Sequence, residues 1–261
     1  MGEKRKMTDT ALTNENIEVK QEEVQETKTE EPKKEAGKFE STGALRTAAH
    51  SNMKEVYARK SKAYKVAKRA FDVILSGGAI VVLSPLLLVT AVAVKAADGG
   101  PVLYAKPRAG KDNKPFNMYK FRSMYVNADE KLKELLAQNE QTGHAFKIKN
   151  DPRITKVGKI IRRTSIDELP QLLNIIKGDM SIVGPRPILD WQMDECDDYD
   201  KQRLVVQPGL TCYWQVGGRS NITWDEWVEL DLKYIDDMSL LTDLKLILLT
   251  FPAIIKGEGA Y

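Results

Sequence analysis

The sequence predicts an α+β protein that is mostly helical and contains a membrane helix. Residues 73–94 form a 22-residue stretch without a charged side chain, which is long enough to cross a bilayer as a helix. Two short extended runs, residues 101–105 and 115–121, flank a Gly-Lys-Asp-Asn turn signal at residues 110–113 and predict a small β-hairpin. Helical apolar periodicity then dominates residues 221–238, and the apolar residues 240–255 fit either an interfacial helix or a buried one.

The N-terminal segment has a different composition from the rest of the 261-residue chain. Residues 1–40 hold 19 charged residues and seven large apolar ones, too few to offset the entropy of ordering. We therefore expect residues 1–60 to form a disordered, charged tail. Lys4, Arg5 and Lys6 are not followed by an apolar region, so no secretory signal is expected. Residues 41–261 have a net charge of +6, which suits anionic lipid or phosphate partners.

The apolar stretch contains Ser84 and Pro85 near its centre. Proline removes a backbone hydrogen bond and clashes with the preceding turn, so we expect a kink, with the serine hydroxyl bonding to a freed carbonyl. Both flanks are basic and both favour the cytoplasmic side. These flanking residues are Lys60, Lys62, Lys65, Lys68 and Arg69 before the stretch, and Lys95, Lys106, Arg108, Lys111 and Lys114 after it. A re-entrant helix and a straight-spanning helix both remain open from the residues alone.

Two basic segments follow the stretch. Lys120 and Arg122 bracket Phe121 in the second predicted strand, where solvated cations are a slightly better interpretation than phosphate contacts. Residues 151–163 place five cations among apolar side chains, which is typical of an amphipathic segment on an anionic membrane surface or of a plain solvated face.

The densest concentration of candidate chemistry is residues 159–187. Asp167 and Glu168 come at the predicted start of a helix, where Ser165 and Glu168 have the spacing of a capping box. Pro170 allows a later start, with the helix beginning at residue 169 or 170. Capping is the ordinary role of such acids, but ionised carboxylates there can also bind a metal or attack phosphorus. Arg186 follows the helix between two prolines that fix its backbone.

Other classes of site are disfavoured. The chain has two histidines, so a Ser-His-Asp hydrolase or a His-rich zinc centre is not expected. Cys196 and Cys212 lack metal spacing and are expected to be reduced structural thiols. Aromatic residues precede Arg219 in a Gly-Gly-Arg turn, where they either stack a base or, more commonly, pack in a core.

The combined pattern resembles the bacterial sugar transferase family, the monotopic phosphoglycosyl transferases that start polyprenol-linked glycan assembly. The resemblance covers residues 64–261, and the first 60 residues of the chain carry none of the matching runs. The matching runs are KRAFDVILS, LSPLLL, YKFRSM, DPRITKVGKIIRRTSIDELPQLLNIIKGDMSIVGPRP, QPGLTCYWQVGGR and LDLKYIDDMSL. Larger family members carry further segments in front, so this chain resembles a minimal form.

The resemblance implies a reaction and its site residues. A UDP-sugar gives its sugar-1-phosphate to Asp167, and undecaprenyl phosphate then takes it, with UMP released in the first step. Asp167 matches the nucleophile and a position linked to Mg²⁺, Glu168 its essential neighbour, and Arg162 the polyprenyl-phosphate contact. Arg186 and Arg219 are expected to bind the nucleotide sugar. Gly218 stands where many relatives have asparagine, so sugar-binding detail at that turn is not carried over.

The resemblance also implies an arrangement at the membrane. It identifies Ser84 and Pro85 with the family's re-entrant kink, giving a monotopic protein with interfacial amphipathic helices. The expected organisation is a tail at residues 1–60, a basic flank and re-entrant helix at 61–98, and a catalytic domain at 99–261. That domain is expected on the cytoplasmic face of a bacterial inner membrane, with membrane lipids and without nucleic acid as partners.

The expected pathway is exopolysaccharide or capsule assembly, with glucose, galactose or an N-acetylated sugar transferred. The sequence leaves the oligomeric state open. Two other classes stay open as alternatives: a non-catalytic membrane adaptor and a membrane-anchored, magnesium-dependent phosphatase.

Overall fold

The computed structural model describes residues 52–128, 130, 151–189, 193, 196–217 and 222–256. The chain divides into two units, Met1–Glu40 and Ser41–Tyr261, and every described residue belongs to the second. Most of the expected disordered tail therefore lies outside the described residues. The expected boundary at residue 60 is too late, because Met53–Arg59 form helix α3. Met53 is buried in the core and its backbone N–H donates to Gln202 Oε1 at 2.9 Å.

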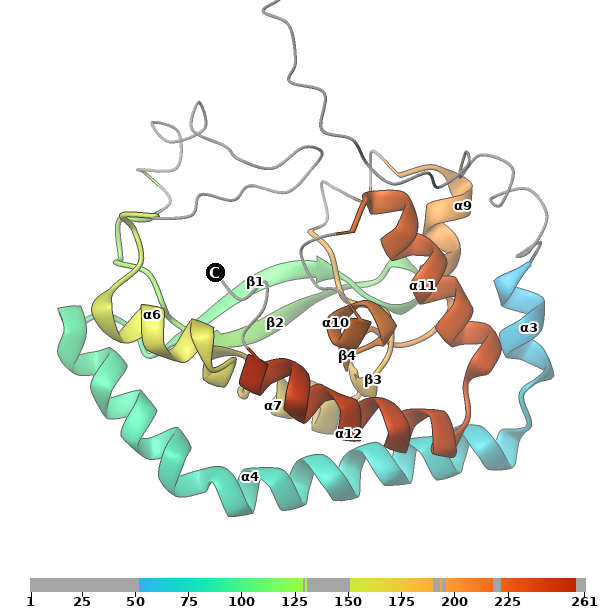
Figure 1. Cartoon of the computed structure of the whole chain (residues 1–261), viewed down its shortest axis with the longest axis horizontal. Helices are drawn as coiled ribbons and strands as arrows, with labels where there is room; N and C mark the ends of the chain where they lie inside the picture. Colours follow the sequence, from blue (N-terminus) through green and yellow to red (C-terminus); the bar gives the residue numbers. More distant parts are fainter. Residues whose placement is uncertain are drawn as a thin grey trace, which may run out of the picture. The chain divides into compact units, whose positions relative to one another are not determined.

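The described part of the second unit is mostly helical with two small sheets, which confirms the predicted α+β class (Figure 1). Its larger helices are α4 (Lys62–Asp98), α6 (Lys156–Arg163), α7 (Gln171–Lys177), α11 (Trp224–Asp237) and α12 (Leu240–Lys256). Its shorter helices are α9 (Asp198–Lys201), α10 (Tyr213–Gly217) and the 3-10 turns η1 (Lys111–Asn113), η3 (Ile166–Glu168) and η4 (Gln202–Val205).

The predicted hairpin is present. Strands β1 (Leu103–Ala109) and β2 (Pro115–Phe121) pair antiparallel, with Leu103 opposite Phe121 and Ala109 opposite Pro115. The turn uses left-handed backbone at Asp112 and Asn113, residue types that tolerate a positive φ. A second sheet joins β3 (Ser181–Val183) and β4 (Gly209–Thr211) in parallel.

Helix α4 runs through the whole apolar stretch and changes direction part-way along its length (Figure 1). Pro85 lies inside the helix and has no N–H to offer the carbonyl of Val81, four residues earlier. The Ser84 hydroxyl donates to that carbonyl at 2.8 Å, as the sequence predicted. The Ser84–Pro85 pair therefore bends the helix without leaving this backbone acceptor unpaired.

The outer face of α4 is apolar and exposed. Only 11% of its most apolar 18-residue window is buried, so α4 is not the core helix of a soluble domain. The helix is long and apolar enough to cross a membrane. Its inner face is different, because Lys68, Asp72 and Ser76 recur every four residues and are buried. Helix α4 packs this side against α6, α7 and β3.

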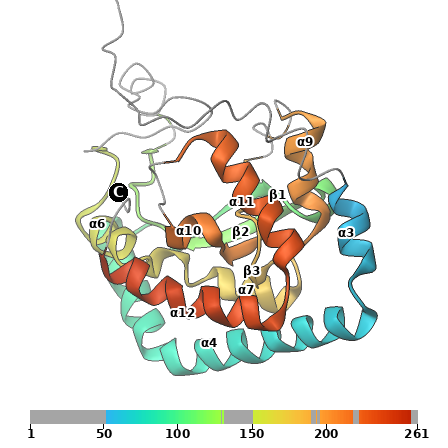
Figure 2. The same cartoon turned by 45° about the vertical axis from the view of Figure 1, so that its right-hand side comes forward.

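Helix α12 runs beside α4 in both views (Figure 1, Figure 2). It packs against α10, β3 and β4, and Leu246 on its inner face is fully buried. Large apolar side chains on other faces are 60% or more exposed: Leu241, Leu248, Phe251 and Ile255. Helix α12 is therefore buried on one face and exposes an apolar surface on others, and its expected position at a membrane interface stays a prediction.

Candidate active site

The two acids lie in a one-turn 3-10 helix, η3, between α6 and α7. Pro170 occupies the N-cap position of α7, so the regular helix begins at Gln171, close to the later of the two predicted starts. The predicted capping box is wrong. Ser165 has φ 56° and makes no capping hydrogen bond, whereas an N-cap residue takes extended backbone. The Glu168 carboxylate is instead held by charged partners, which form stronger hydrogen bonds than a backbone N–H.

Glu168 joins three separate elements. Lys120 on β2 donates to its Oε1 at 2.7 Å. Arg186, from the segment after β3, donates to Oε1 at 2.5 Å and to Oε2 at 3.2 Å. Burial acts to raise the pKa of Glu168, but Arg186 and Lys120 outweigh it and hold that pKa well below its usual range. Glu168 is therefore a permanent carboxylate that holds two cations in place.

Asp167 has a different environment. It is 8% exposed, and among the described residues none forms a hydrogen bond or an ion pair with its carboxylate. Burial raises the pKa of Asp167; Lys120, Arg162 and Arg186 oppose this rise, and the charge of Glu168 adds to it. The structure thus presents one uncommitted carboxylate beside three cationic residues.

The backbone around Arg186 is fixed by the β3–β4 sheet. Gly184 N–H donates to the Thr211 carbonyl at 3.0 Å, and Gly209 N–H donates to the Pro185 carbonyl at 2.8 Å. Arg203 donates to the carbonyl of Arg186 itself at 2.9 Å. The Gly-Pro-Arg-Pro segment and the Gln-Pro-Gly-Leu-Thr segment, read separately in the sequence, are therefore one structural unit.

This unit depends on two glycines that touch. A Cβ atom on Gly209 would lie 2.1 Å from the Gly184 nitrogen, and one on Gly184 would lie 2.5 Å from the Gln207 carbonyl oxygen. Both contacts involve backbone atoms, which cannot move aside as the end of a side chain can. Only glycine permits the two segments to approach this closely.

Arg203 supports the same segment from behind. It is 1% exposed, forms an ion pair with the buried Asp231, and its guanidinium lies 5.4 Å and 5.1 Å from the ring centroids of Trp224 and Trp227. The aromatics of α11 are thus largely a core scaffold. Cys196 and Cys212 are buried thiols that form no disulfide, as expected.

Arg162 lies in the last turn of α6, which packs against η3. Its positive charge acts on both Asp151 and Asp167 and lowers the pKa of each relative to burial alone. The structure therefore brings Arg162, Asp167, Glu168 and Arg186 together. Arg219 lies outside the described residues.

Sequence reasoning missed Lys120. We favoured solvated cations for Lys120 and Arg122, and the structure corrects this for both. Lys120 is bound to Glu168, and Arg122 is 8% exposed and paired with Asp98. The signal available was the position of Lys120 in the strand, two residues after Met118, which is buried. The intervening residue, Tyr119, donates its backbone N–H to Asn174 Oδ1 of α7 at 2.9 Å. That contact, between segments 55 residues apart, brings β2 against the acid-bearing segment.

The fold and the site define a class of protein. A carboxylate beside several cations suits chemistry on anionic, phosphate-bearing molecules, and a long exposed apolar helix suits association with a membrane. Comparison with known proteins gives the family. Residues 63–257 match the model of the bacterial sugar transferases, and the chain belongs to this family.

Curated relatives agree with this membership. The galactosyl transferase CpsE of Streptococcus agalactiae is 42% identical over 232 residues, which are 87% of this chain and 51% of that protein. The undecaprenyl-phosphate galactose phosphotransferase of Salmonella typhimurium is 45% identical over 200 residues, 74% of this chain and 41% of that protein. The exopolysaccharide production protein ExoY of Sinorhizobium fredii is 40% identical over 200 residues, 75% of this chain and 88% of that protein. The chain thus spans about half or less of the first two proteins.

Proposed function

We propose that this protein is a membrane-bound phosphoglycosyl transferase that moves a sugar-1-phosphate from a UDP-sugar to undecaprenyl phosphate. The observation that carries the proposal is the uncommitted, buried carboxylate of Asp167 beside Lys120, Arg162 and Arg186. Relatives named as an undecaprenyl-phosphate galactose phosphotransferase and as exopolysaccharide production proteins support the substrate class and a role in exopolysaccharide or capsule assembly.

The reaction proceeds in two displacements at one phosphorus atom. An Asp167 oxygen attacks the phosphorus that carries the sugar, forming an aspartyl phosphosugar, while the bond to the bridging oxygen breaks and its electron pair leaves with UMP. A phosphate oxygen of undecaprenyl phosphate then attacks the same phosphorus, and the electron pair of the aspartyl–phosphorus bond returns to the carboxylate. Dividing the transfer in this way avoids direct displacement between two anionic substrates.

The neighbouring residues have separate roles. Glu168 keeps Lys120 and Arg186 in place, Arg186 and Arg219 bind the nucleotide diphosphate, and Arg162 meets the phosphate of the lipid acceptor. These assignments are supported for Lys120 and Arg186 by their ion pairs with Glu168. Cations directed at developing negative charge stabilise the transition state and need no reorganisation.

The residues present fit a magnesium ion. Mg²⁺ is commonly held by one or two carboxylates together with substrate phosphates, and Asp167 is a carboxylate without a competing partner among the described residues. Within that part of the chain no group of three or more potential ligand residues exists, so Asp167 would hold the ion with oxygens from the diphosphate. Magnesium supplies charge neutralisation for the diphosphate.

A decisive test replaces the proposed nucleophile. We expect membranes with Asp167→Asn to release no UMP from UDP-sugars, whereas Asp198→Asn, at an exposed acid of α9, should retain normal release. Without lipid acceptor, the unmodified protein should gain the mass of one phosphosugar in intact mass spectrometry. Normal turnover by Asp167→Asn would exclude the covalent route. UMP release followed by free sugar phosphate, without lipid product, would indicate the phosphatase alternative.

The re-entrant topology of α4, with the domain on the cytoplasmic face of the inner membrane, is part of the proposal. It is supported by the bend at Pro85, by basic residues at both ends, and by exposed apolar side chains on α4 and α12. Single cysteines at the exposed positions Lys62 and Lys114 should react with a membrane-impermeant maleimide from the same side.

The two native cysteines should contribute little maleimide labelling to this experiment. Both are buried, and burial raises the pKa of the Cys196 thiol to about 11, so little thiolate is present. Labelling of the two introduced cysteines from opposite sides would show that α4 spans the membrane.

A further inference from the structure

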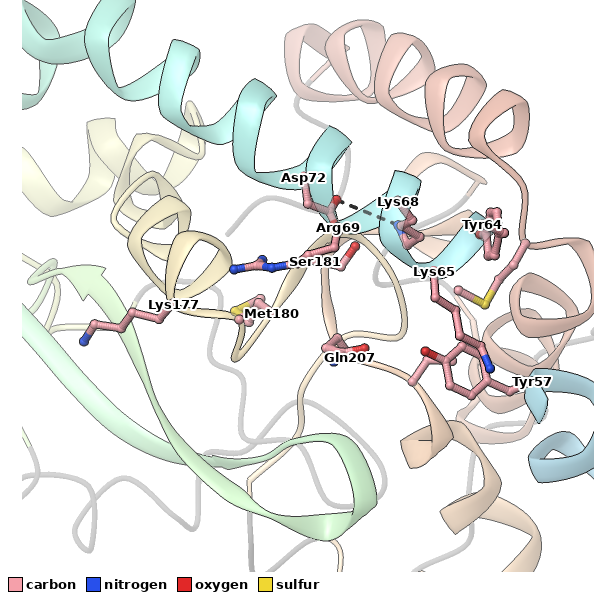
Figure 3. A pocket seen from close by; sticks show the side chains of 13 residues that line it. Tyr57, Tyr64, Lys65, Lys68, Arg69, Asp72, Lys177, Met180, Ser181 and Gln207 are labelled. Carbon is pink, nitrogen blue, oxygen red and sulfur yellow. Dashed lines mark ion pairs between the residues drawn. The ribbon is translucent and has the colours of Figure 1, made fainter. Parts of the chain in front are cut away.

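A cavity of about 360 Å³ lies apart from the acid pair, beside the N-terminal part of α4 (Figure 3). Its walls come from α3, from the first turns of α4, from the C-terminal end of α7 and from the segment before β4. Asp167 and Glu168 precede the opposite end of α7, a helix of seven residues, so about 10 Å of helix separates the two places. None of the acid-pair residues, Lys120, Asp167, Glu168 and Arg186, lines the cavity.

The lining is strongly cationic. Four basic residues, Lys65, Lys68, Arg69 and Lys177, line the cavity with a single carboxylate, that of Asp72. Lys68 is committed elsewhere, because its Nζ lies 2.7 Å from Asp243 Oδ2 and 3.8 Å from Asp72 Oδ1. The four basic residues and the two carboxylates together leave a formal charge of +2, and Lys65, Arg69 and Lys177 form no ion pair with a described residue.

These three cations have neutral partners in the described part of the chain. The Lys65 ammonium lies 4.4 Å from the ring centroid of Tyr57. Arg69 donates to the carbonyls of Ile175 and Ile176 at the end of α7, at 2.5 Å and 2.6 Å. Lys177 donates to the Tyr119 hydroxyl at 2.6 Å. Each contact orients a positive charge without cancelling it.

The composition and place of the cavity indicate its ligand. Its volume is in the range of small-molecule sites. Ser181 and Gln207 add polar groups between the cations (Figure 3). The uncharged stretch of α4 begins at residue 73, four residues and therefore about 6 Å beyond Arg69. Basic pockets next to membrane helices bind anionic head groups.

We propose that this cavity binds a phosphate group, carried either by an anionic phospholipid head group or by a soluble phosphate ester. The site is separate from the proposed transfer reaction and does not depend on it. Phosphate oxygens accept hydrogen bonds from several ammonium and guanidinium groups at once, and the lining offers three such groups that form no ion pair in the described part of the chain. Lys65 is the best probe of this site because its side chain supports no hydrogen bond that the fold needs.

The test uses the full chain in nanodiscs of phosphatidylcholine, with and without phosphatidylglycerol. Binding of inorganic phosphate and of glycerol 3-phosphate is measured by calorimetry, and retention of phosphatidylglycerol by native mass spectrometry. Lys65→Gln and Lys177→Gln should each weaken binding about tenfold, the loss of one charge-assisted hydrogen bond. Lys62→Gln, an exposed lysine of the same helix outside the cavity, should leave binding unchanged.

The outcomes distinguish a soluble phosphate ester from a phospholipid head group, and distinguish both from anion binding at another place on the protein. Weakened binding of the soluble phosphates identifies a soluble ester as ligand, and weakened retention of phosphatidylglycerol alone identifies the head group. Equal losses in Lys65→Gln and Lys62→Gln would show a diffuse surface effect and overturn the proposal. Binding that depends on Lys120 but not on Lys65 or Lys177 would place the anion at the acid pair and also overturn it. A failure of this test leaves the Asp167 experiment unaffected.

Discussion

At the scale of single residues, the two adjacent acids differ because their carboxylates have different partners. Glu168 is bound by Lys120 and Arg186, and its pKa is held low. Asp167 has no such partner among the described residues, and burial raises its pKa. One acid therefore organises positive charge, and its neighbour remains available for a reaction at that charge.

Lys120→Met tests this division. Lys120 is the strongest influence opposing the rise in the pKa of Asp167, so its loss should raise that pKa further. A carboxylate with a higher pKa is protonated at higher pH, and the pH below which activity falls should move upward. We also expect UMP release at neutral pH to fall about a hundredfold, as when a preorganised charge is removed.

The control is Lys114→Met, which removes an exposed lysine from the same hairpin. It should keep the wild-type rate and the wild-type pH profile. A Lys120→Met protein with a lower rate but an unshifted profile would mean that Lys120 acts only on structure.

At the scale of elements, helix α6 is set in place by the residues that precede it. Arg153 donates to the Asp151 carboxylate through its backbone N–H at 2.9 Å, its Nε at 2.9 Å and its Nη2 at 2.6 Å. The Arg153 carbonyl accepts a hydrogen bond from Tyr125 N–H at 2.9 Å, and Thr155 caps α6. This clamp fixes the entry of the helix that carries Arg162.

The clamp should make stability depend on pH. Burial acts to raise the pKa of Asp151, but its hydrogen bonds and ion pair with Arg153 outweigh burial and lower it. A lowered folded-state pKa stabilises the protein above the unfolded value of about 3.9, and this contribution is lost as pH falls through the folded-state pKa. At neutral pH, Asp151→Asn should cost about 3 kcal/mol, as for a broken buried pair.

Denaturant unfolding from neutral pH to about pH 3 measures this effect. The difference between wild type and Asp151→Asn should shrink toward the acid end. Asp198→Asn, on the surface, should stay within about 0.5 kcal/mol of wild type. A difference for Asp151→Asn that is constant with pH would contradict the assigned pKa direction.

The elements that could be predicted from sequence are those whose signals are local. The apolar length of α4, the proline at its centre and the Gly-Lys-Asp-Asn turn of the hairpin act within a few residues, and each prediction is confirmed. The capping box at Ser165 is also a local signal, but it failed because Lys120 and Arg186 compete for Glu168. Such long-range partners cannot be read from spacing along the chain.

At the scale of the whole described unit, α4 is attached by buried polar contacts. Asp243 of α12 is fully buried and bonds to Lys68 of α4 at 2.7 Å and to the Tyr234 hydroxyl at 2.8 Å. Asp72 of α4 accepts a hydrogen bond from Ile182 N–H of β3 at 3.1 Å. β3 leads directly into the segment of Arg186, so the apolar helix and the acid-pair site share one polar framework.

Asp243→Asn should destabilise the protein by about 3 kcal/mol, because it removes the nearer of the two carboxylates that pair with the buried Lys68 ammonium. Asp237→Asn is the matched control, since Asp237 forms an exposed pair with Lys233 worth less than about 1 kcal/mol. Unfolding by guanidinium in detergent micelles measures both. Replacing both partners, with Lys68→Met and Asp243→Leu, should cost less than Asp243→Asn; a larger cost would show that the pair itself is net stabilising.

The contact between Gly184 and Gly209 limits how this protein can be recombined with its relatives. The two glycines stand 25 positions apart in sequence, yet each occupies the space that a side chain on the other would need. A graft that imports the Gly-Pro-Arg-Pro segment without β4 replaces only one of the two segments that pack against each other. Functional chimeras are therefore expected to have crossover points before residue 181 or after residue 211, so that both segments come from one parent.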